Sequence, residues 1–115
     1  MSNTRAHIVD LGTDPSIRIA GELRDRLNAA IARHDSVVVS GDAVASVDIS
    51  ILQLLASAHR SASAAGKTIS IRAPAEGALR AALVRAGFVD AQGMPLAAEG
   101  DFWTRFPHAA KDEAA

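Results

Sequence analysis

The chain has no cysteine among its 115 residues, which excludes disulfides, thiolate metal sites and cysteine nucleophiles. It also has no uncharged apolar run of about 18 residues, so no segment is expected to span a membrane. The N-terminus lacks the apolar stretch of a secretory signal. With 12 basic and 13 acidic residues the net charge is −1, which gives no basis for nucleic-acid binding. We therefore expect a cytoplasmic protein.

Residues arranged for catalysis or for metal binding are missing as well. The four histidines, His7, His34, His59 and His108, show no metal-ligand spacing. Ser50 and His59 would lie on one helix more than two turns apart, so they form no catalytic pair, and Asp48 has no recognisable acid–base partner. The glycines form no phosphate-binding loop. The sequence therefore predicts a protein that is not an enzyme and that holds neither metal nor cofactor.

Aromatic residues are few, and three of the four lie close together. The segment that begins at Ala91 differs in composition from the rest of the chain. It contains three aromatic residues within five consecutive positions, namely Phe102, Trp103 and Phe106. One interpretation is that this tail folds back onto the core, since each fully buried large side chain contributes about 1.5–3 kcal/mol. The other is a contact with a partner or a second copy, because Trp and Phe are enriched in interfaces.

Hydrophobic residues make up 49% of the chain, enough for one packed core, and strand-like runs alternate with helical spacing. The expected strands are at about 6–11, 36–40, 67–72 and 88–89. The first expected helix begins after a cap at Asp14 or Ser16 and ends near His34, and the other two helices are at about 48–65 and 74–86. This order predicts an α/β fold, with a small mixed, largely parallel sheet of about four strands covered by about three helices. We expect residues 1–90 to form the domain and residues 91–115 to form a C-terminal extension packed on it.

The most informative stretch is the start of the second helix. Asp48 directly precedes the apolar helical pattern and is expected to cap it, its side chain accepting a hydrogen bond from the N–H of Ser50 or Ile51. Ile51 lies on the apolar stripe and should point inward, whereas Ile49 lies off the stripe and should be exposed. Ser50, in the first turn, either bonds locally to backbone or water or is a site of modification or partner contact.

Three segments resemble STAS domains, the family of anti-sigma-factor antagonists. They are Val47-Asp48-Ile49-Ser50-Ile51-Leu52-Gln53-Leu54-Leu55, then Ala64-Ala65-Gly66-Lys67 with the strand that follows, and Leu83-Val84-Arg85-Ala86-Gly87-Phe88. The resemblance covers about residues 7–89. It implies a small sheet covered by helices and a non-enzymatic, partner-binding role. In many STAS domains a kinase phosphorylates the hydroxyl residue after the motif Asp, which releases the partner.

Two positions depart from the family pattern. The residue after the motif Asp is Ile49, which cannot be phosphorylated, and the family Gly falls at Ile51. Ser50 is the nearest remaining hydroxyl and so the possible phosphorylation site. An exposed Ile49 beside the helix start would instead form a drier docking surface, which suggests constitutive binding.

The leading hypothesis is a bacterial signalling adaptor that binds an anti-sigma factor or another histidine-kinase-type ATPase domain. The partner-binding residues would be Asp48, Ile49, Ser50 and, at the flank, Gln53. The alternative is a STAS subunit that docks on the ATPase of a bacterial lipid-transport ABC system. The absence of a phosphorylatable residue at position 49 suits such a permanent subunit. The sequence leaves the oligomeric state open.

Overall fold

The computed structural model describes residues 7–74, 77–90, 92, 94–96 and 100–103. Three parallel strands form the sheet in the order β1 (His7–Asp10), β2 (Ser36–Ser40) and β3 (Thr68–Arg72). The helix α1 (Ala20–Arg33) connects the first two strands and α2 (Ile49–Ala64) connects the second and third. These are two βαβ units, the connection that parallel strands require.

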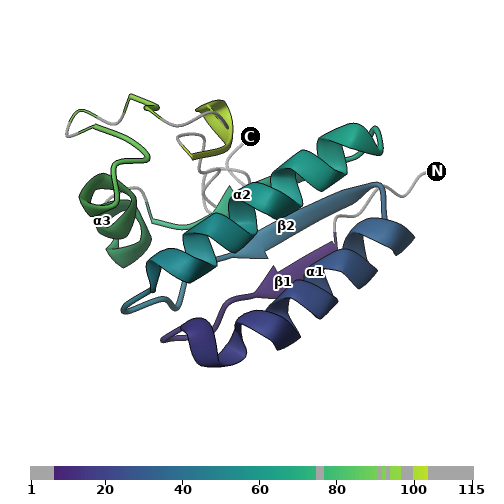
Figure 1. Ribbon diagram of the computed structural model, residues 1–115, viewed down its shortest axis with the longest axis horizontal. Coiled ribbons are helices and arrows are strands. Elements are labelled where there is room, and N and C mark those ends of the chain that lie inside the picture. Colours follow the sequence, from purple (N-terminus) through teal and green to yellow (C-terminus); the bar gives the residue numbers. More distant parts are fainter. Residues whose placement is uncertain (1–6, 75–76, 91, 93, 97–99, 104–115) are drawn as a thin grey trace, which may run out of the picture.

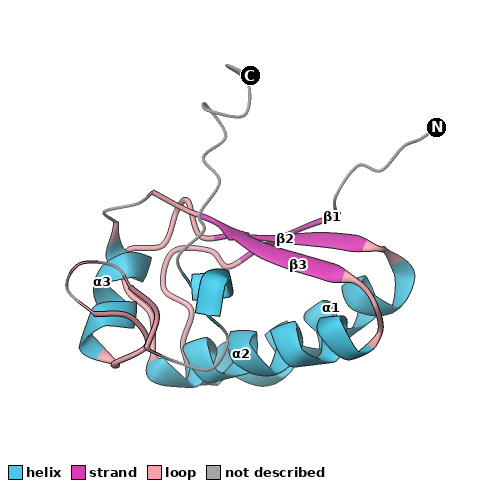
Figure 2. Cartoon of the chain, turned by 90° about the horizontal axis from the view of Figure 1, so that it is seen from above, coloured by secondary structure: helices cyan, strands magenta, loops and turns pink. Residues whose placement is uncertain are grey.

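Both connecting helices lie on the same side of the sheet (Figure 2). Val37 and Val39 of β2 and Ile71 of β3 point to that side and are buried, because alternate residues of a strand face opposite sides. On the other side, Ile8, Val38 and Ser70 occupy matching register positions. Ile8 is 49% exposed there, so within the described residues this side of the sheet carries no helix.

The core lies between the sheet and the helices. It is dominated by aliphatic side chains from the inward faces of the strands and the apolar stripes of the helices. The largest fully buried members are Trp103, Leu23, Leu27, Ile51, Leu52, Leu55, Ile71, Leu79, Leu83, Val37, Val39 and Val89.

Glycines end two of the helices. Gly66 follows α2 with φ +75°, and the N–H of Lys67 donates to the carbonyl of Ala62 at 2.8 Å. Gly87 follows α3 (Ala78–Arg85) with φ +83°, and the N–H of Phe88 donates to the carbonyl of Leu83 at 2.9 Å. Both ends are Schellman motifs, which need a residue in the left-handed region.

The structure corrects the expected elements in three places. A short 3₁₀ helix, η1 (Ile17–Ile19), precedes α1. The helix α3 begins at Ala78 and not directly after Pro74, because Gly77 is extended and its N–H turns back to the carbonyl of Pro74. The expected fourth strand is absent from the described sheet, since Val89 forms only an isolated antiparallel bridge with Pro95.

Phe102 and Trp103, from the expected extension, are part of the core. They belong to the 3₁₀ helix η2 (Gly100–Trp103), which lies on the helical side of the sheet (Figure 2). Trp103 is 0% exposed and its ring contacts Phe88 and Phe102 edge to face, each at 4.8 Å between centroids. These two residues are thus packed against other residues of the chain, while Phe106 lies outside the described residues.

Candidate functional site

The candidate site lies where the strands end and α2 begins. All three strands run in the same direction, so the loops that follow β1 and β2 meet at one edge of the sheet (Figure 1). The first loop leads into η1, and the second, residues 41–48, leads into α2. An ion pair between Arg72 of β3 and Asp42, 3.1 Å from Nε to Oδ2, fixes the start of the second loop.

Hydrogen bonds join these two loops along their length. The backbone N–H groups of Ala45 and Ser46 both donate to the carbonyl of Thr13, at 2.7 and 3.3 Å. The Ser46 hydroxyl donates to Asp14 Oδ1 at 2.8 Å. These bonds hold the two loops as one surface, which keeps the start of α2 in a fixed position relative to η1.

Hydrogen bonds of Asp48 also join the two loops. Its side chain does not cap α2, which corrects the expectation from the sequence. Asp48 directly precedes the helix, but its carboxylate makes no capping bond there. Its Oδ2 instead accepts a hydrogen bond from the N–H of Ile17 at 3.0 Å, and its own N–H donates to the carbonyl of Pro15 at 3.2 Å. The carboxylate therefore stabilises the first turn of η1, whose other cap is Ser16.

The isoleucines on either side of Ser50 behave as the apolar stripe predicts. Ile51 is 0% exposed and faces the core, whereas Ile49 is 53% exposed. Ile51 is thus buried and Ile49 exposed, as their positions relative to the apolar stripe predict. Gln53, one turn further along α2, is exposed.

Ser50 is in the first turn of α2, yet its hydroxyl is shielded from solvent. Its Oγ is buried and has no hydrogen-bond partner in the part of the chain that the structure describes. The local bond to the backbone that is common for such a residue is therefore not made among these residues. In this conformation the oxygen is not accessible to a kinase.

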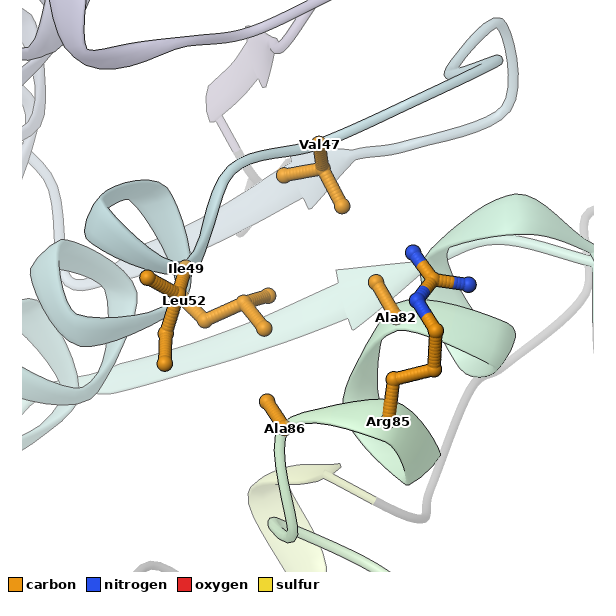
Figure 3. Close-up of a pocket in the computed structure, with 6 residues that line it drawn as sticks. All are labelled: Val47, Ile49, Leu52, Ala82, Arg85 and Ala86. Carbon is orange, nitrogen blue, oxygen red and sulfur yellow. The ribbon is translucent and has the colours of Figure 1, made fainter.

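A pocket of about 240 Å³ lies between the start of α2 and α3. Figure 3 shows side chains from the loop, from α2 and from α3 directed toward this space. Of the described residues that line it, all but one have apolar side chains. The lining residues are Val47, Ile49, Leu52, Ala82, Arg85 and Ala86.

Two residues of this surface were not singled out in the sequence. Ile17 is 67% exposed, and the hydrogen bond from its N–H to Asp48 places it next to the start of α2. Arg85 is exposed at the pocket. An isoleucine in a polar turn, outside any apolar stripe, is the signal that could have identified Ile17. No sequence signal identifies Arg85, because only the packing of α3 against α2 brings it to this site.

A second depression of about 240 Å³ lies between β1 and α1 and is lined among others by His7, His34 and Arg33. The two imidazole rings stack with centroids 4.3 Å apart and planes 6° from parallel. Parallel stacked rings do not direct their nitrogens at a common point. Among the described residues no group of three or more potential ligands could hold a metal ion.

Within the described residues no helix has the length and apolarity needed to cross a bilayer.

Comparison with known proteins identifies the family. Neither the curated proteins nor the solved structures contain a significant match to the sequence. Residues 2–96 match the family model described as "Mlab, STAS domain". Because this match covers more than half of the chain and agrees with the α/β architecture, the chain belongs to this STAS domain family.

Proposed function

We propose that this chain is a non-enzymatic docking module that binds a protein partner around the start of α2. The docking surface comprises Ile17, Asp48, Ile49, the pocket of Figure 3 and, at the flank, Gln53. The observation that carries the proposal is the exposure of two isoleucines, 67% at Ile17 and 53% at Ile49, at the starts of two helices whose preceding loops are joined by hydrogen bonds. Exposed apolar groups on a rigid surface are typical of interaction sites.

The binding is constitutive in this proposal. Ile49 stands where many STAS domains have a hydroxyl that is phosphorylated, and the neighbouring Ser50 Oγ is buried. Adding a phosphate to Ser50 would place a charge of about −1.5 to −2 in this enclosed position. We therefore expect no phosphate-controlled release of the partner.

Two partner classes fit such a module. One is a kinase-type regulatory protein, such as an anti-sigma factor, for which this chain would be a cytoplasmic signalling adaptor in a bacterium. The other is the ATPase of a bacterial lipid-transport ABC system, for which it would be a permanent subunit. The buried Ser50 hydroxyl and the isoleucine at position 49 favour the permanent subunit, because neither offers an accessible phosphate acceptor.

Affinity purification from the native cytoplasm, with mass spectrometry, tests this proposal through the substitution Ile49→Asp. Ile49 is the first residue of α2, where an acidic side chain favours the helix, so a loss of binding would not reflect loss of the helix. Leu96→Asp, at a residue 62% exposed and outside the docking surface, is the matched control.

We expect Ile49→Asp to remove the specific partner and Leu96→Asp to retain it. An ABC ATPase in the purified complex would identify a transport subunit, and a kinase-type protein would identify a signalling adaptor. Retention of every partner by Ile49→Asp would overturn the proposed docking surface.

A further inference from the structure

The pocket beside Ile49 has the size of a side chain and not of a cofactor. Its volume is about 240 Å³, below the roughly 300–1,000 Å³ of pockets that hold small ligands. Five of its six lining residues are apolar, with Leu52 and Ala82 buried at its base. Such a pocket accommodates one large apolar side chain, the kind of anchor that supplies most of the binding energy in protein interfaces.

Among the described residues that line this pocket, Arg85 is the one charged residue. It belongs to the last turn of α3, and Figure 3 shows its side chain running along the pocket, with the guanidinium beside Ala82 on the side of Val47. In the described residues, the guanidinium has neither a hydrogen bond nor an ion pair. By contrast, Arg72 on the neighbouring β3 pairs with Asp42 at 3.1 Å.

A partner that covers this pocket would remove water from an unpaired guanidinium. Burying a charge without a counter-charge is unfavourable, whereas a carboxylate can accept two parallel N–H bonds from a guanidinium. The pocket therefore selects for partners that bring a carboxylate next to the apolar anchor. A partner with a basic residue at this place would be excluded by like-charge repulsion.

We propose that Arg85 determines partner specificity: the docking segment of the partner inserts one large apolar side chain between α2 and α3 and pairs an Asp or Glu with Arg85. This inference rests on the proposed docking surface and adds the chemistry of the partner. A purely structural role for Arg85 is the alternative, because its aliphatic stem covers apolar surface and its charge suits the C-terminus of a helix.

Selection of peptides from a random library displayed on phage, carried out separately on the wild-type chain and on Arg85→Glu, distinguishes these roles. Arg33→Glu is the matched control, since it makes the same charge change in the last turn of α1, beside the other depression. Peptides enriched on the wild type are then synthesised, and their Kd values are measured by fluorescence anisotropy, each beside a copy with its acidic residue changed to Lys.

We expect the wild type to enrich peptides that combine a large apolar residue with Asp or Glu. Arg85→Glu should weaken these peptides about tenfold or more and should prefer the Lys copies, while Arg33→Glu leaves both affinities unchanged. Reversal of the charge preference is a result that a structural role for Arg85 would not produce.

Two other results would count against the inference in different ways. Enriched peptides that require Ile49 but show no acidic preference, or that bind Arg85→Glu as tightly as the wild type, would overturn the role of Arg85 alone. If no enriched peptide is lost on Ile49→Asp, or if none is enriched, the docking surface itself would be wrong.

Discussion

At the scale of single residues, the start of α2 departs from what its sequence suggests. Asp48 occupies the capping position, but its carboxylate is bonded to the N–H of Ile17 across the gap between two loops. Ser50 has a hydroxyl that is buried without a partner. The bond of Asp48 arises because η1 lies next to the start of α2, and nothing in the local sequence around Asp48 indicates that contact.

Asp48→Ala should lower the free energy of unfolding by about 1 kcal/mol, because one charge-assisted hydrogen bond to a helix start is lost. It should also speed hydrogen exchange at the amide of Ile17, which loses its acceptor. Urea unfolding and amide exchange measured by NMR check these outcomes. Asp25→Ala, which removes only an exposed pair with Arg24, should change stability by less than about 0.5 kcal/mol. Unchanged exchange at Ile17 would contradict the assigned role of Asp48.

Ser50→Ala should raise the free energy of unfolding by about 1 kcal/mol. It removes a buried polar atom that has no partner and adds helix propensity. Ser57→Ala, an exposed position of the same helix, adds propensity alone and should contribute about 0.5 kcal/mol or less. Thermal and urea unfolding of both variants isolate the effect of the buried hydroxyl. A destabilised Ser50→Ala variant would show instead that the hydroxyl makes a favourable interaction.

At the scale of elements, apolar periodicity predicts where the helices lie, and glycines mark where α2 and α3 end. The periodicity predicted both ends of α2 and the C-terminal end of α1 to within about one residue, since each helix buries a continuous stripe against the sheet. The start of the first helix was expected after a cap at Asp14 or Ser16; Ser16 does cap a helix, but this is η1, and α1 begins only at Ala20. The left-handed Gly66 was predictable because no other residue adopts that conformation without strain. The fourth strand was predicted wrongly, because the short apolar pair Phe88–Val89 fits a strand or a bridge equally well.

The same Gly→Ala change should have opposite effects at two positions. Gly66→Ala should lower stability by about 1–2 kcal/mol, because alanine is strained at φ +75°. Gly21→Ala should raise it by about 0.5 kcal/mol, because Gly21 lies in α1 and an added Cβ would meet nothing within 4 Å. Urea unfolding of the two variants tests the pair. Equal effects at both positions would contradict the Schellman motif at the end of α2.

At the scale of the whole molecule, the C-terminal aromatics complete the core. Two short βαβ units leave apolar surface on β3 and α2, and η2 covers part of it. Phe102 stacks on His59 of α2 with centroids 4.5 Å apart, and Trp103 is fully buried. Phe102 and Trp103 are therefore buried in the same core as the sheet.

Trp103→Ala should lower the free energy of unfolding by about 3–5 kcal/mol, a large share of the total stability of a small domain. Leu96→Ala, at an exposed residue of the same segment, should change it by no more than about 0.5 kcal/mol. Circular dichroism in urea measures both. A loss of less than about 1 kcal/mol for Trp103→Ala would mean that the segment docks only loosely on the domain.

The sequence by itself determined the order of strands and helices, the parallel sheet, and the inward and outward directions of Ile51 and Ile49. These properties depend on local periodicity and on short connections, which neighbouring residues encode. Only the tertiary structure decided that Asp48 bonds to Ile17, that the Ser50 hydroxyl is buried, and that Arg85 lines a pocket with Ile49. These contacts join residues about 30 or more positions apart in the chain, and such distant pairs meet only when the sheet and helices pack.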